Sequence, residues 1–210
     1  MSVDKATSWA FCEDVVAEDE VLVGARERAA ELGTAPVSSG TGALLTVLAS
    51  TAQAQAVVEI GTGTGVASLY LLRGMVPNGV LTTIDAEAEH HRAAKEAFAE
   101  AGIKTTRTRT IAGRASDVLT RLTESAYDLV FINTDPEDVL TLVDQAYRLL
   151  RPAGLLVVND ALWHDRVGDP ARRDEQTTAM RQVGKHIRED EQLLTALVPV
   201  GGGVLIAVKP

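Results

Sequence analysis

A run of glycines at the end of a buried strand is the feature that most constrains the fold of this chain. Residues 56–60 (AVVEI) have the apolar pattern of a buried strand, and residues 61–65 (GTGTG) follow it directly. Glycine tolerates positive φ and lets a ligand approach bare backbone, as at the carboxyl edge of a parallel sheet. The pattern predicts a strand, a turn and a helix that border a ligand site. A tight turn that serves packing alone is the alternative.

Apolar β-rich segments alternate with amphipathic segments after this loop. The first kind comprises residues 80–85, 105–111, 127–133 and 155–160, and the second comprises residues 87–101, 116–123 and 136–150. This alternation predicts an α/β fold with a doubly wound, mostly parallel sheet. Residues 193–200 and 204–208 flank three glycines, which favours a C-terminal antiparallel hairpin.

The segment before the glycine loop is helical in pattern. Residues 3–32 are acidic and helical, Gly33 is a stop signal with Pro36 beyond it, and residues 41–49 predict a further short helix. A chain of 210 residues suits one α/β domain and is short for two. We therefore expect a single domain over residues 1–210, with N-terminal helices over residues 1–50 and an α/β core over residues 56–210.

Charge and composition exclude several classes of function. The formal net charge of −9 disfavours nucleic acids and anionic membranes as partners. Cys12 is the single cysteine, so no internal disulfide forms, and the N-terminus lacks the basic and apolar regions of a secretion signal. No apolar run approaches the ~20 residues of a membrane span. These features predict a cytoplasmic protein.

The glycine spacing and one acidic residue narrow the class of ligand. Gly61, Gly63 and Gly65 are evenly spaced, which disfavours a dinucleotide, and no Gly-Lys-Ser/Thr sequence follows, which disfavours phosphate transfer. Asp85 ends the second predicted strand, where a carboxylate accepts hydrogen bonds from ribose hydroxyls. Taken alone, Asp85 also suits the N-cap of the helix predicted over residues 87–101. Together the loop and the acid indicate a nucleoside ligand.

These motifs resemble those of the cation-dependent small-molecule O-methyltransferases, the family that includes the catechol and caffeoyl-coenzyme A O-methyltransferases. The resemblance covers most of the chain and rests on EIGTGTG (59–65), Asp85, AGRASDVL (112–119), YDLVFIN (127–133), LLRPAGLLVVNDALWHDRV (149–167) and the final GGGVLIAVK. It implies a Rossmann-like methyltransferase fold with seven strands and S-adenosylmethionine as cofactor. It also implies a small-molecule acceptor and a homodimer in which the N-terminal helices help to form the acceptor pocket.

The resemblance assigns the cofactor contacts residue by residue. Glu59 and the glycine loop would lie near the methionine end, Asp85 on the ribose, and residues 113–115 beside the adenine. Ser68 adjoins Ala67, where the usual serine of the family falls. The implied cofactor-binding residues are Glu59, Gly61, Thr62, Gly63, Gly65, Ser68, Asp85, Ala86, Gly113, Arg114, Ala115 and Asn133.

The metal site of the family is altered here. The family holds a divalent cation with two Asp and one Asn, whereas the matching positions are Asn133, Asn159 and Asp160. One carboxylate should bind Mg²⁺ or Ca²⁺ more weakly than two. Pro136, which cannot act as a base, replaces the usual lysine. The alternative is that Asn133 and Asp160 cap strand ends and hydrogen-bond neighbouring loops.

His164 is a candidate general base because it follows the proposed pocket segment, and a surface loop histidine is the alternative. Adjacent His90 and His91 cannot share a helix face, so solvent exposure is expected for both. Cys12 is expected to be a buried small residue. Arginines in the same loop would meet an anionic acceptor or pair with surface acids; they are Arg166, Arg172 and Arg173.

The sequence thus predicts an S-adenosylmethionine-dependent methyltransferase that acts on an oxygen of a small, phenol-like acceptor, with metal dependence weakened or lost. One alternative is a metal-free enzyme that uses His164 or basicity supplied by the substrate. The other is a non-catalytic, regulatory protein that keeps the fold and binds the cofactor. The replacements at Asn133 and Pro136 motivate that second alternative.

Overall fold

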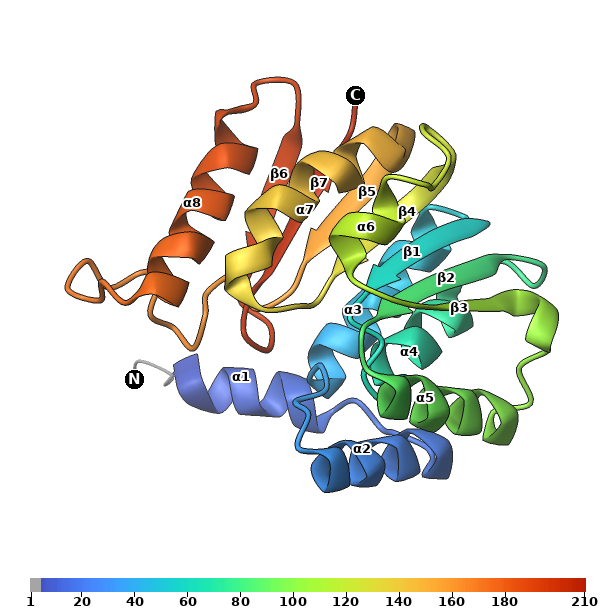
Figure 1. The fold of residues 1–210 in the computed structure, drawn as a ribbon. Coiled ribbons are helices and arrows are strands. Elements are labelled where there is room, and N and C mark those ends of the chain that lie inside the picture. The colour runs from blue at the N-terminus through green and yellow to red at the C-terminus, as the bar shows by residue number, and fades with distance from the viewer. Residues whose placement is uncertain (1–4) are drawn as a thin grey trace.

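A seven-stranded sheet with helices on both faces forms the centre of the computed structural model, which describes residues 5–210 (Figure 1). The strand order is β3-β2-β1-β4-β5-β7-β6. Strand β7 runs antiparallel to β5 and β6, and the other neighbouring strands of this sheet are parallel to each other. The strands are β1 (Ala56–Ile60), β2 (Val80–Asp85), β3 (Thr108–Ala112), β4 (Tyr127–Ile132), β5 (Leu150–Val158), β6 (Leu194–Val198) and β7 (Val204–Val208). The predicted doubly wound sheet with a C-terminal hairpin is confirmed.

Two apolar layers bury the faces of the sheet. Val57 and Val58, adjacent on β1, belong to different layers because successive strand side chains point to opposite faces. One layer is covered by α2 (Glu20–Leu32), α3 (Ser39–Thr51), α4 (Val66–Gly74) and α5 (Ala88–Glu100). The other is covered by α6 (Ala115–Leu119), α7 (Pro136–Leu149) and α8 (Glu175–Glu189). The remaining elements are α1 (Lys5–Asp14) and the short 3₁₀ helix η1 (Thr105–Arg107).

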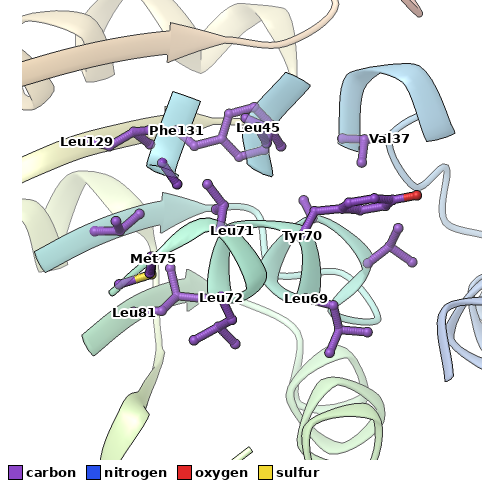
Figure 2. Packing of buried hydrophobic residues seen from close by; sticks show 14 of the residues in the cluster. Val37, Leu45, Leu69, Tyr70, Leu71, Leu72, Met75, Leu81, Leu129 and Phe131 are labelled. Atoms are coloured by element: carbon purple, nitrogen blue, oxygen red, sulfur yellow. The ribbon is translucent and has the colours of Figure 1, made fainter. Parts of the chain in front are cut away.

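Helix α4 is buried on nearly all sides, since it follows the glycine loop into the core. Leu71 and Leu72 are almost fully buried. Figure 2 shows Tyr70 and Leu71 of α4 in the same layer as Leu45 of α3 and Phe131 of β4. This packing fixes the start of α4, and therefore the glycine loop, against the sheet.

Local signals explain the helix ends. The Asp19 side chain accepts a hydrogen bond from the Leu22 amide at 3.1 Å and begins α2, and Gly33, at φ 68°, ends it. Ser38 caps α3 in the same way. The helical pattern over residues 3–32 is therefore two helices, α1 and α2, because Asp19 starts a new one. Val3 lies outside the described residues.

Several predicted bounds were wrong. Strand β5 begins at Leu150, earlier than residue 155, and a register shift between Tyr127 and Leu129 accommodates the extra residues. It ends at Val158, and Asp160 lies in a turn at φ 51°. The segment 105–111 starts as η1, and α6 ends at Leu119. Helix α8 was not foreseen.

No helix within residues 5–210 has the length and apolar character needed to cross a bilayer.

Candidate active site

The glycine loop lies at the carboxyl end of β1, between the ends of β2 and β4. Gly61 has φ 90°, and a Cβ there would overlap the backbone oxygen of Asn133. The Gly61 amide donates to the Ile84 carbonyl at 2.9 Å, and the Asn133 amide donates to the Ile60 carbonyl at 2.9 Å. Three strand ends are thus tied together around a position that only glycine fits. Gly63 and Gly65 also have positive φ.

Glu59 is a fully buried carboxyl group on β1. Its Oε2 accepts a hydrogen bond from the Ser68 hydroxyl of α4, and its Oε1 has no partner. Burial raises the pKa of Glu59 to about 7, and the nearby charge of Asp85 adds to the rise. A buried polar atom without a partner is rare in folded proteins. Oε1 is therefore available to a donor on a ligand.

Asp85 is the last residue of β2, and its side chain accepts a hydrogen bond from the glycine loop. Its Oδ2 accepts from the Gly63 amide at 3.0 Å, and its Oδ1 accepts from the Glu87 amide at 2.9 Å. The ring of His90 lies 3.1 Å from Oδ2. Glu87, not Asp85, is the N-cap residue of α5, and its own side chain makes no cap bond.

The other residues assigned to the cofactor lie around these two acids. The Gly113 amide donates to the Asp85 backbone oxygen at 2.9 Å, which places the start of α6 beside the end of β2. Thr62 is buried and shares a 2.6 Å hydrogen bond with Thr83. Ala86 and Arg114 are exposed, and Ala115 is half-buried. The structure brings this set to one edge of the sheet.

Asn133, Asn159 and Asp160 lie at the ends of β4 and β5. The Asn159 amide donates to the Asn133 side-chain oxygen at 2.9 Å, and Asn159 Oδ1 is buried without a partner. Burial raises the pKa of Asp160, although the charge of His164 opposes the rise. Two amides bonded to each other and a single carboxyl group fit a hard cation poorly, because such cations favour more than one carboxylate.

A left-handed turn follows Asp160. Trp163, His164 and Asp165 all have positive φ, at 43°, 53° and 61°. The rings of Trp163 and His164 lie 4.8 Å apart, and His164 is exposed. Consecutive non-glycine residues in this region are strained and are held by their surroundings. Here the amides of Ala161 and Leu162 donate to carbonyls of the glycine turn at 201–203, each at 2.9 Å.

Glu13 joins the N-terminal helix to the same edge, which sequence reasoning missed. Its carboxylate accepts from the Gly40 amide at 2.6 Å and the Gly201 amide at 3.1 Å. The hydroxyls of Ser38 and Ser39 add further bonds. Burial alone would raise the pKa of Glu13, but these hydrogen bonds hold it below its usual value. No local pattern could have shown a contact between residues so distant in sequence.

Two expectations about other side chains were wrong, and a third agrees with the structure. Cys12 is exposed, since no residue of α1 is buried. His91 is buried between α5 and the end of β2, so exposure was wrong for this histidine. Arg172 pairs with Asp169 at 3.8 Å, with both side chains exposed, which is the surface pairing expected as one of two alternatives.

Comparisons with known proteins give one consistent result. The O-methyltransferase family model matches residues 13–210. A curated probable O-methyltransferase from Mycobacterium tuberculosis is 52% identical over 201 residues, which cover 96% of this chain and 90% of the relative. A solved protein from Corynebacterium glutamicum is 38% identical with a TM-score of 0.90, covering 98% of this chain and 96% of that one. The O-methyltransferase TomG from Streptomyces achromogenes, solved in complex with S-adenosylmethionine, is 27% identical with a TM-score of 0.86 over the whole of both chains.

Proposed function

The chain belongs to the O-methyltransferase family, and from that premise we propose that it transfers the methyl group of S-adenosylmethionine to an oxygen of a small, phenol-like acceptor. The observation that best supports cofactor binding is the buried Oε1 of Glu59, which has no partner and lies beside a glycine loop with accessible backbone. The ammonium group at the methionine end of the cofactor can donate a hydrogen bond to this atom, and its positive charge is attracted to the acid.

Asp85 would bind the ribose hydroxyls, and Gly113, Arg114 and Ala115 would border the adenine. Asp85 is already oriented by the amides of Gly63 and Glu87, so the carboxylate is held in place before the ligand arrives. Ser68 would keep Glu59 oriented in the same way.

When bound, the cofactor supplies a methyl group on a positively charged sulfur that is open to in-line displacement. The protein positions the acceptor oxygen and receives its proton as the carbon–oxygen bond forms. His164 is the candidate acceptor of that proton, because it is exposed in the turn that follows the half-buried Asp160. No step is routed through a cation, since the three residues at the expected metal position fit one poorly.

Calorimetry with S-adenosylmethionine, with and without Mg²⁺, tests the proposal, followed by methylation of a panel of phenols. Cofactor binding and methylation that do not respond to metal are expected. Binding without methylation of any acceptor would favour a regulatory protein that keeps the fold. Absence of binding at millimolar cofactor would remove the proposal.

Asp85→Ala supplies a residue-level test of the cofactor site. The variant should weaken S-adenosylmethionine binding by about 1 to 3 kcal/mol, because charge-assisted hydrogen bonds to the ribose are lost. Asp117→Ala, which removes an exposed acid from α6, is the control. An affinity equal to that of the wild type would show that the ribose lies elsewhere.

The exposed apolar side chains of α1 support a homodimer that buries this helix. Phe11 of α1 is 67% exposed and Trp9 on the same helix is 43% exposed, and Val15, which directly follows the helix, is 65% exposed. Large exposed apolar side chains of this kind favour an interface. Light scattering during gel filtration should give twice the monomer mass, and Phe11→Asp should halve it. A monomeric wild type would exclude the dimer.

A further inference from the structure

A cavity of about 370 Å³ lies between α5 and the edge strand β3. It is lined by Ala88, His91, Arg92 and Lys95 of α5 and by Thr110 and Ala112 of β3. None of these residues belongs to the set assigned to the cofactor, the acceptor or the metal. The cavity therefore needs an explanation of its own.

His91 lines this cavity and has a ring nitrogen without a hydrogen-bond partner. Only 7% of the residue is exposed. Its Nε2 lies 3.0 Å from the Asp85 backbone oxygen, and a carbonyl can only accept, so Nε2 carries the hydrogen and donates. In the neutral ring Nδ1 is then an acceptor, and it is buried with no partner. Such an atom calls for a hydrogen-bond donor from a ligand.

The same cavity is cationic. Lys95 has no ion-pair partner among residues 5–210. Arg92 is exposed, and its Nε and Nη2 contact the Glu89 carboxylate at 2.9 Å and 2.8 Å. These contacts leave the Nη1 of Arg92 for a ligand. The Thr110 side chain adds a hydroxyl on the β3 side. An anion is the ligand that two cations and a hydroxyl favour.

Hydrogen phosphate and singly protonated phosphate monoesters meet both requirements at once. Their anionic oxygens would face Lys95 and Arg92, and their P–OH group would donate to Nδ1 of His91. An ionised carboxylate has no hydrogen to give to that nitrogen. We propose that this cavity is a binding site for a phosphate group, free or carried as a monoester, separate from the methyl-transfer site.

Calorimetric titration with inorganic phosphate and with glycerol 3-phosphate, at matched ionic strength, tests the site. Lys95→Gln should weaken binding by about ten-fold. His91→Gln should weaken it comparably, because the glutamine Nε2 can keep the bond to the Asp85 carbonyl while the Nδ1 acceptor is lost. Lys185→Gln is the matched control, since it removes a lysine from α8 on the opposite face of the sheet.

S-adenosylmethionine affinity should be the same in Lys95→Gln and the wild type, which separates this site from the proposed cofactor site. Tighter binding of glycerol 3-phosphate would identify a monoester as the natural ligand, and equal or weaker binding would identify free phosphate. Failure of the wild type to bind either probe at millimolar concentration would overturn the proposal. So would equal binding by Lys95→Gln and Lys185→Gln, a comparison that holds even if His91→Gln does not fold.

Discussion

Two residues at the end of β1, Glu59 and Gly61, contribute to the proposed cofactor site in different ways. The carboxyl group of Glu59 is fully buried, and the backbone at Gly61 leaves no room for a side chain. The first stores an unsatisfied acceptor for a ligand. The second allows the end of β1 to approach the residue that follows β4 closely at the proposed cofactor site.

Gly61→Ala should destabilise the fold by roughly 3 kcal/mol, because its Cβ would overlap the Asn133 carbonyl at a φ that alanine avoids. Gly63→Ala is the matched control: it also has positive φ, but its Cβ meets no heavy atom within 4 Å, so about 1 kcal/mol is expected. Urea unfolding measures both values. Equal losses would mean that the close approach to Asn133 does not constrain the loop.

The sequence was sufficient to place Gly61 and Asp85, since both follow from a local pattern of strand and turn. It was not sufficient to reveal the free Oε1 of Glu59 or the free Nδ1 of His91. Those atoms lack partners because of what packs around them, and packing joins residues far apart in the chain. Glu13 was missed for the same reason.

At the scale of elements, α1 is attached to the rest of the molecule mainly through its last turn. None of its residues is buried, yet Glu13 accepts bonds from the start of α3 and from the β6–β7 turn. A helix held in this way should open more easily than the sheet. These hydrogen bonds to Glu13 hold α1 in position relative to the proposed acceptor side.

Glu13→Gln should increase amide hydrogen exchange in residues 5–14 by about ten-fold, equivalent to about 1.4 kcal/mol, with little change in the strands. The amide keeps one acceptor oxygen and loses the charge, so bonds from Gly40 and Gly201 weaken. Asp14→Asn, an exposed neighbour with no ion pair among the described residues, should leave exchange as it is. Similar exchange in both variants would show that Glu13 does not hold the helix.

Helix α8 shows where element prediction failed although a signal existed. Asp174 caps the helix through the Thr177 amide at 3.0 Å, and Met180, Val183 and Ile187 are buried at helical spacing. No helix is predicted from the sequence between residues 160 and 193, although this cap and spacing are typical of one. The early start of β5 had no comparable signal, because Pro152 and Gly154 are typical of a turn and only pairing with β4 makes the segment a strand.

For the molecule as a whole, carboxyl groups with a shifted pKa change the free energy of unfolding in two opposite directions with pH. Glu13, Glu18 and Asp128 have a lowered pKa, because hydrogen bonds outweigh the effect of burial. Their contribution to the free energy of unfolding is present above the pKa of the unfolded chain and is lost as pH falls below it. Glu59 has a raised pKa, so its contribution is present at low pH and is lost as pH rises toward 7.

Without cofactor, stability should therefore be greatest near pH 5 and should fall by about 2 kcal/mol between pH 5 and pH 7 on account of Glu59, whose pKa rises from 4.5 to about 7. Glu59→Gln should remove this fall and leave the loss in acid. Urea unfolding between pH 4 and pH 8 measures both limbs, with Glu87→Gln as an exposed control. Parallel curves for wild type and Glu59→Gln would contradict the assignment.

The reversed direction of β7 has a consequence for how acceptor choice can change. Because β7 opposes β5 and β6, the turn that joins β6 to β7 returns to the edge where the parallel strands end, and there it supports the segment after Asp160. This turn is covalently remote from the glycine loop and from Asp85. Under the proposed function, exchange of the five-residue connector at 199–203 would change the acceptor side and leave the proposed nucleoside contacts untouched.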